Sequence, residues 1–111
     1  MEITTKQYKR CEVVKATGRV DSHTAPQLAE TFNTITEAGQ FHIAFDMSEI
    51  EFMSSAGLRV LISTQKLCKR LNRGQVVLVG VPQRIYEAFD LAGIIPLFTF
   101  YDNVVDAVGS F

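Results

Sequence analysis

Residues 51–62, EFMSSAGLRVLI, carry the chain from a strand into a helix, and two serines stand at the junction. EFM (51–53) resumes the extended, apolar pattern of HIAFDM (42–47). From Gly57 onward, core-facing residues recur at helical spacing, and they are Val60, Leu61, Thr64, Leu67, Cys68 and Leu71. Gly74 is expected to end this helix. A strand that leads directly into a helix is typical of an α/β fold.

Before the junction, the pattern predicts two strands and a helix. EITTKQYK (2–9) and KRCEVVKATGRV (9–20) are rich in β-branched residues and are expected to turn near Lys9 and Arg10. A helix is predicted from Thr24 to about Ala38, with Gly39 as the residue after its end. Its first turn contains Pro26, which needs no N–H partner there, and its inner face is formed by Ala25, Leu28, Ala29, Phe32 and Ile35.

After the junction, strand and helix alternate again. QVVLVGV (75–81) is a continuous apolar run, which predicts a strand covered on both faces. Pro82 opens a helix that Gly93 ends, with an inner stripe of Ile85, Phe89 and Ala92. LFTFY (97–101) is expected to form a last strand, and DNVVDAVGSF (102–111) a short helix capped by Asp102 or Asn103.

The order of these elements predicts an α/β fold with a mixed sheet of about four to five strands. The sheet is expected to be parallel after an antiparallel N-terminal pair and to carry about four helices. A length of 111 residues with 47% hydrophobic residues fits a single domain, residues 1–111. The net charge of −1 gives no reason to expect a nucleic-acid partner.

Cysteine usage and hydropathy predict a cytoplasmic protein. Cys11 and Cys68 have no CxxC spacing, and a pair this sparse does not suggest a disulfide framework. The sequence has no apolar run of 18 residues and no apolar segment near Met1. We therefore expect neither a membrane-spanning helix nor a secretory signal.

Two serines beside a glycine raise the question of a hydrolase. A nucleophile elbow needs glycine at the position that Met53 occupies. His42 lies inside an apolar strand pattern and His23 has no spacing that suggests a base. The sequence also lacks phosphate-binding glycine motifs and clusters of metal ligands. We expect neither catalysis, nor a metal, nor a cofactor.

Ser54 and Ser55 are expected to have different roles. One serine suffices as an N-cap, which is worth about 1 kcal/mol. If Ser54 is the cap, Ser55 takes the first helical position with its hydroxyl open to a kinase. A helix N-terminus also accommodates a phosphate group.

The helix after the serines has two surface features that could serve a partner. Leu58 and Ile62 fall off the core stripe, beside Gln65 and Lys69, and are expected to stay partly exposed. Such a pair is more often incidental than functional, but it can mark a partner surface. The outward face is basic, and a solvated face is favoured over a binding stripe for Arg59, Lys66, Lys69, Arg70 and Arg73.

The segment GRVDSHTAPQL (18–28) offers three capping residues for the first helix: Asp21, Ser22 and Thr24. One of them is expected to cap it. The carboxylate of Asp21 could also orient a kinase, or hold the serine loop, if the fold brings the two loops together.

The segments GRVDSHTAPQL (18–28), FDMSEIEFMSSAGLRVLI (45–62) and VVLVGVPQRIYEAFDLAGIIPLFTFYDNVVDAV (76–108) resemble, in order and spacing, the STAS domain of bacterial anti-sigma factor antagonists. The central family motif is Asp-Ser-Ser/Thr-Gly-Leu after an apolar strand. Here it reads Ser54-Ser55-Ala56-Gly57-Leu58, with Ser54 in place of the usual Asp and Ala56 in place of a hydroxyl residue.

The resemblance implies a partner switch. The unphosphorylated antagonist would bind an anti-sigma factor that is also a serine kinase of the histidine-kinase-like ATPase type, and so free a sigma factor. Phosphorylation would abolish that binding, and a PP2C-type phosphatase would restore it. The phosphoacceptor would be Ser55, with Ser54 as second choice, and Asp21 would lie close to it.

The partner-binding residues implied by this resemblance are Asp21, Ser54, Ser55, Ala56, Gly57, Leu58 and Ile62. The alternative within the same family is an accessory subunit of a lipid ABC transporter or of a larger signalling assembly. The protein itself is expected to be a monomer or a weak dimer.

Overall fold

Five strands and four α-helices alternate along the chain after an initial strand pair. The computed structural model describes the backbone of residues 1–111 and the side chains except that of Leu71, whose predicted place on the inner stripe lies outside the described part. The elements are β1 (Glu2–Gln7), β2 (Glu12–Val20), α1 (Ala25–Glu37), β3 (His42–Met53), α2 (Ser55–Lys69), β4 (Gln75–Val79), α3 (Gln83–Leu91), β5 (Thr99–Tyr101) and α4 (Val104–Gly109), with short 3-10 helices at Arg70–Asn72 and Ile95–Leu97.

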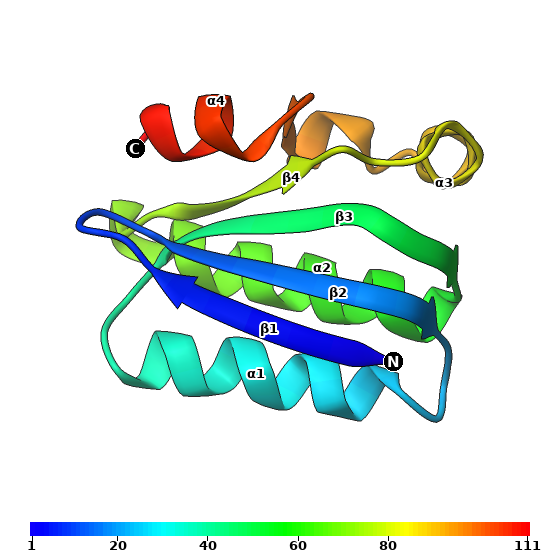
Figure 1. Ribbon diagram of the computed structural model, residues 1–111, viewed down its shortest axis with the longest axis horizontal. Helices are drawn as coiled ribbons and strands as arrows, with labels where there is room; N and C mark the ends of the chain where they lie inside the picture. The colour runs from blue at the N-terminus through cyan, green and yellow to red at the C-terminus, as the bar shows by residue number, and fades with distance from the viewer.

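The strands form one sheet in the order β1-β2-β3-β4-β5. β1 and β2 are antiparallel, whereas β2, β3, β4 and β5 are mutually parallel. Helices α1 and α2 contact each other on one face of the sheet; in the view of Figure 1, α2 lies behind β2 and β3, α1 lies below them, and α4 lies at the top. The predicted mixed sheet with an antiparallel start and four helices is confirmed.

The sheet separates two apolar clusters. The larger one lies between the sheet and helices α1, α2 and α3, and includes Val76 and Leu78 of β4. The smaller one lies under α4 and includes the alternate β4 residues Val77 and Val79. Successive side chains of a strand point to opposite faces, so the continuous apolar run at 75–81 reflects a strand that is covered on both sides.

Helix α2 is rotated slightly from its predicted orientation. Its buried residues are Gly57, Leu61, Thr64, Gln65 and Cys68. Val60 and Leu67, predicted to face the core, are only half-buried, and Gln65, predicted to lie off the core, is 4% exposed. Gln65 is buried because the polar backbone of β4 and of the Ile95–Leu97 segment surrounds it and bonds its amide group.

The predicted end of α2 at Gly74 is wrong. The α-helix ends at Lys69, a 3-10 turn follows, and Asn72 adopts the left-handed conformation with φ 55°. Asparagine tolerates this conformation better than most residues. Gly74 has a different role, because a Cβ there would collide with the carbonyl group of Phe41.

Three smaller predictions also differ from the structure. β3 runs without interruption through residues 48–50, with register shifts against β2 in place of a break. Ala92 is exposed because α3 ends at Leu91. The last strand is shorter than LFTFY, since Ile95–Leu97 forms a 3-10 turn and β5 starts at Thr99. Within the described residues, no helix is both long and apolar enough to cross a bilayer.

Candidate functional site

Ser54 joins β3 to α2 and caps the helix. Its backbone is extended, with φ −84° and ψ 173°, and its hydroxyl oxygen accepts a 3.4 Å hydrogen bond from the N–H of Gly57. Its carbonyl accepts the first intrahelical bond, from the N–H of Leu58 at 3.1 Å. The prediction that Ser54 serves the helix is therefore confirmed.

Ser55 is the first residue of α2, and it is exposed. The first N–H groups of a helix have no partner within the helix, and they give its N-terminus a partial positive charge. The cap at Ser54 satisfies the N–H of Gly57 and leaves the start of the helix around Ser55 open to solvent. Ser55 thus combines an accessible hydroxyl with a local field that favours an anion.

The loops after β2 and β3 lie side by side. Val20 pairs with Met53 in the parallel register, and the N–H of Ser54 donates a 2.8 Å hydrogen bond to the carbonyl of Val20. Gly57 permits this approach, because a Cβ there would lie 2.8 Å from Val20 Cγ1 and 3.0 Å from Met53 Cγ. Asp21, the residue after Val20, is consequently placed in the loop next to the serines.

Asp21 organises its own loop. Its Oδ1 accepts hydrogen bonds from the N–H groups of His23 and Thr24, both at 3.0 Å. The hydrogen bond from the Thr24 N–H is the main reason why the pKa of Asp21 is lowered. Desolvation opposes it, and the His23 N–H, the Thr24 hydroxyl and the charge of Arg19 lower the pKa further. The carboxylate is therefore ionised at neutral pH, and Asp21 lies partly exposed in the loop beside the serines.

The prediction that Asp21, Ser22 or Thr24 caps α1 is confirmed for the position, because Thr24 is the N-cap residue. The Thr24 side chain makes no capping hydrogen bond, however. Its hydroxyl instead accepts from the N–H of Asp21 at 3.0 Å and donates to the carbonyl of Arg19 at 2.9 Å. The carbonyl of Asp21 accepts from the N–H of Ala25, so a backbone turn starts the helix.

Leu58 and Ile62 are half-buried, and they pack against the edge of the larger core cluster together with Ala56. Their outer surfaces continue from Ser55 along one side of α2. The prediction of partial exposure is confirmed for both residues. The fold therefore places the loop of Asp21 and the segment from Ser54 to Leu58 at the carboxyl ends of β2 and β3, and Ile62 lies one turn further along α2.

Two neighbours of this site were not predicted. Arg19 and Phe52 are register partners on β2 and β3, and the Arg19 guanidinium lies 4.4 Å from the centre of the Phe52 ring. Phe52 is 39% exposed. The sequence signal was weak, because these residues reveal their pairing only when the register between the two strands is known.

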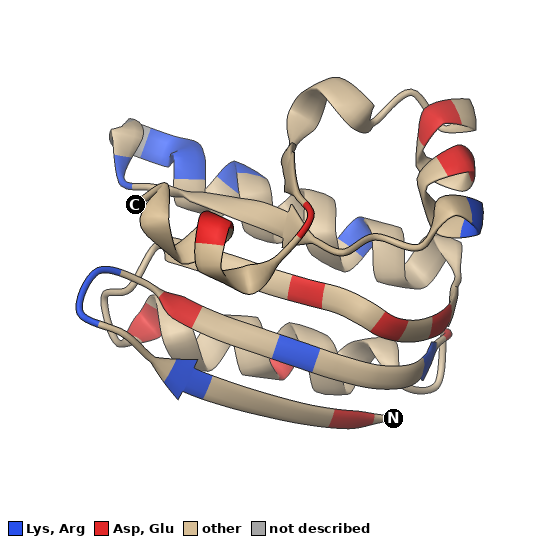
Figure 2. Cartoon of the chain, turned by 45° about the horizontal axis from the view of Figure 1, so that its top comes forward, with Lys and Arg blue, Asp and Glu red and all other residues tan. Residues whose placement is uncertain are grey.

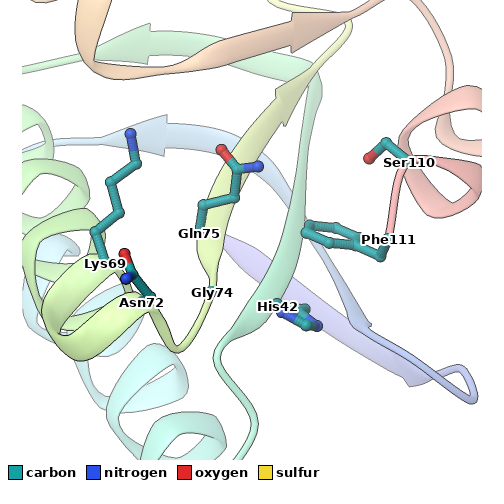
Figure 3. A pocket seen from close by; sticks show the side chains of 7 residues that line it. All are labelled: His42, Lys69, Asn72, Gly74, Gln75, Ser110 and Phe111. Carbon is teal, nitrogen blue, oxygen red and sulfur yellow. The ribbon is translucent and has the colours of Figure 1, made fainter.

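A cavity of about 620 Å³ lies at the amino ends of β3 and β4, at the opposite end of the sheet from Ser55 (Figure 3). It is lined by His42, Lys69, Asn72, Gly74, Gln75, Ser110 and Phe111. The His42 ring stacks on Phe111 with centroids 5.0 Å apart, and its Nδ1 lies 3.1 Å from the Arg10 carbonyl. His42 is therefore too distant to act as a base for either serine.

The geometry around the serines gives no sign of a metal site. Across the described residues, no group of three or more His, Cys, Asp or Glu side chains is close enough to hold a metal ion. His23 contributes its backbone N–H to Asp21 and is exposed in the neighbouring loop. What the arrangement offers is a modifiable hydroxyl, an adjacent carboxylate and a partly apolar helix face.

Comparison with known proteins identifies relatives over nearly the whole chain. The STAS domain family matches residues 2–107. The anti-sigma-B factor antagonist of Staphylococcus aureus is 31% identical over 91 residues, which cover 82% of each chain.

Solved structures of anti-sigma factor antagonists have the same fold as this chain. An anti-sigma factor antagonist from Mycobacterium paratuberculosis superimposes with a TM-score of 0.82 at 25% identity, over 98% of this chain and 92% of that one. The Bacillus cell fate determinant SpoIIAA in its phosphorylated form matches with a TM-score of 0.78 at 16% identity, over 98% of both chains. The unphosphorylated form of the antagonist SpoIIAA matches with a TM-score of 0.77 at 14% identity, over 98% of this chain and 96% of that one.

Proposed function

This chain belongs to the STAS domain family, and we propose on that premise that it is an anti-sigma factor antagonist, a protein-binding module controlled by phosphorylation of Ser55. The observation that carries the proposal is that the two serines at the start of α2 have different structural roles. Ser54 is engaged as the cap, whereas Ser55 is exposed at the first helical position. The unmodified protein would bind and sequester an anti-sigma factor in the cytoplasm and thereby free a sigma factor.

The binding surface that we propose consists of Asp21, the loop from Ser54 to Gly57, Leu58 and Ile62. Partial burial of Leu58 and Ile62 leaves apolar area that a partner can cover. Arg19 and Phe52 would extend this surface to the ends of β2 and β3, where Phe52 is 39% exposed. The ionised Asp21 beside it would give a cationic group of the partner a specific contact.

Phosphorylation would switch this surface off by charge. A phosphoserine adds about 1.5 to 2 negative charges, and desolvating them against an apolar partner surface costs several kcal/mol unless the partner supplies a cation. The start of α2 tolerates the phosphate. The phosphorylated and unphosphorylated forms of SpoIIAA share the fold of this chain to a similar degree, which supports a switch without refolding.

The enzymes that we propose for this cycle follow from the family. The anti-sigma factor would itself be the serine kinase, of the histidine-kinase-like ATPase type, and a PP2C-type phosphatase would remove the phosphate. Ser54 stands where the family usually has an acid. Asp21, on the adjoining loop after β2, carries a carboxylate, and this carboxylate would replace the missing acid in recognition by the kinase.

The test uses the cognate kinase with ATP, intact-mass measurement and peptide mapping. Wild type and Ser54→Ala should each gain one phosphate, on Ser55, whereas Ser55→Ala should gain none and still bind the kinase. Ser55→Asp should lose binding. Modification of Ser55→Ala at Ser54 to the wild-type extent would move the acceptor to Ser54. Wild-type binding by Ser55→Asp would refute the switch, and co-purification with a transporter ATPase would favour the accessory-subunit alternative.

A further inference from the structure

A second surface adjoins the proposed binding surface at Ile62 and continues along the other half of α2. Between α2 and the Ile95–Leu97 turn is a groove of about 440 Å³. Its residues, here called the basic groove, are Ile62, Gln65, Lys66, Lys69, Arg70 and Leu97. The half-buried Ile62 and Leu97, which is 42% exposed, supply apolar surface, and three exposed cations surround it.

The basic groove is preformed, because Gln65 connects α2 to the Ile95–Leu97 turn on the other side of the groove. The Gln65 Nε2 donates to the carbonyl of Leu97 at 2.8 Å and to that of Val76 at 3.1 Å, and its Oε1 accepts from the N–H of Val76. The amide is 4% exposed. A site held open in this way costs little conformational entropy to fill.

The outer surface of α3 has the complementary chemistry. Leu91 is 91% exposed, the highest value among the large apolar side chains described as exposed. Glu87 and Asp90 flank it on the same helix and are exposed as well, and Figure 2 shows these acids along α3. These three residues are the acidic ridge. Arg84, at the start of α3, lies about two turns from Leu91 and about one turn from Glu87.

The acidic ridge cannot fill the basic groove of its own chain. Ile85 and Phe89 anchor the opposite face of α3 in the larger core cluster, so Leu91 points to solvent. The sequence has no acid from Met53 to Tyr86, so α2 itself supplies no negative charge to the groove. Lys66 and Lys69 compensate the partial negative charge at the end of α2, but that charge is only about half an electron.

We propose that the acidic ridge of one copy docks into the basic groove of a second copy, and that two copies exchange these contacts to form a weak, closed dimer. Leu91 would cover Ile62 and Leu97, while Glu87 and Asp90 would meet Lys66, Lys69 and Arg70. Reciprocal contacts close the assembly at two copies. Exposed charge pairs make the association dependent on salt.

Sedimentation equilibrium of the whole chain tests the proposal. The weight-average mass should rise from 12.4 kDa toward twice that value as the protein concentration approaches about 1 mM, as expected for a small interface. The dissociation constant should increase about tenfold or more between about 0.05 M and about 0.5 M NaCl. A mass that stays monomeric at low salt, or that grows without a limit at the dimer, would overturn it.

Paired variants identify the surfaces. Leu91→Asp and the double variant Lys66→Glu/Arg70→Glu should each be monomeric. The matched controls are Val105→Asp, which alters a residue 80% exposed on α4, and Lys6→Glu/Lys15→Glu, which changes the charge equally on β1 and β2. Both controls should dimerise like wild type.

A mixture of two charge-reversed proteins tests the complementarity. Glu87→Lys/Asp90→Lys has a basic ridge and Lys66→Glu/Arg70→Glu has an acidic groove, so each protein alone should be monomeric, whereas the mixture pairs opposite charges at both contacts. Association should reappear in the mixture at a concentration near that of wild type. Equal dimerisation of wild type and both ridge and groove variants would refute the assignment, and so would a mixture that stays monomeric.

Discussion

The carbonyl of Val20 accepts a 2.8 Å hydrogen bond from the N–H of Ser54, and this bond links the loop of Asp21 to the loop of the serines. Both loops follow strands of the same parallel pair, so their positions are set by the sheet. The bond also gives the N–H of Ser54, just before the first residue of α2, a partner that the helix itself does not provide. The proposed phosphoacceptor is therefore presented by a rigid junction.

Gly57→Ala should destabilise this junction. The added Cβ would meet Val20 and Met53 side chains at 2.8 and 3.0 Å, and overpacking of this kind costs about 1–3 kcal/mol. Urea denaturation would measure the loss. Gly109→Ala is the matched control, because it lies in a helix where no atom is within 4 Å of the new Cβ, and it should be neutral or stabilising. Equal stability of both variants would contradict the close approach.

Gln65→Met should lower the free energy of unfolding by about 2–4 kcal/mol. It nearly preserves the side-chain volume but leaves backbone groups of Val76 and Leu97 without their bonds to Gln65. Gln27→Met, at an exposed position of α1, should change stability by less than about 0.5 kcal/mol. If the two variants unfold at the same urea concentration, the amide of Gln65 does not hold the walls of the groove.

Acid should weaken the Asp21 loop. The pKa of Asp21 is lowered in the folded protein, mainly by the Thr24 N–H, so its contribution is fully present above the unfolded pKa of about 3.9. That contribution is lost as the pH falls through the lower, folded pKa. Asp21→Asn should therefore be less stable than wild type at pH 7, and the difference should shrink toward pH 2–3.

Ser22→Ala is the control for this pH dependence. It changes an exposed residue of the same loop that carries no titratable group. Its stability difference from wild type should be the same at both pH values in urea unfolding. A stability difference for Asp21→Asn that is equally independent of pH would show that the carboxylate charge has no role in the loop.

Cys68 should resist alkylation in the native protein. Burial raises its pKa to about 11, so at pH 8 only about one molecule in 10³ carries the thiolate that reacts. In Cys11→Ser, iodoacetamide should label Cys68 at pH 8 far more slowly than in about 6 M guanidinium chloride, as followed by mass spectrometry. Similar rates in the two conditions would place the thiol outside the core.

The local predictions that succeeded depend on short-range chemistry. Ser54 and Asn103 were each one of two candidates for a cap, because a hydroxyl or amide before an apolar helical pattern can accept from a helical N–H; the Asn103 side chain accepts from the N–H of Asp106 at 2.9 Å. Before α1 the same reasoning gave three candidates, and only the position of Thr24 was confirmed. Each can cap, but Thr24 and Asp21 bond within their own turn instead.

The sequence by itself determined the order of strands and helices and the antiparallel start, and it narrowed the cap of α2 to Ser54 or Ser55. These features follow from periodicity and capping, which act over a few residues. Tertiary structure alone decided that Val20 touches Ser54, that Gln65 is buried, and that Arg19 stacks on Phe52. Periodicity shows which side of an element turns inward, but what covers that side depends on strand register and on neighbours far away in the chain.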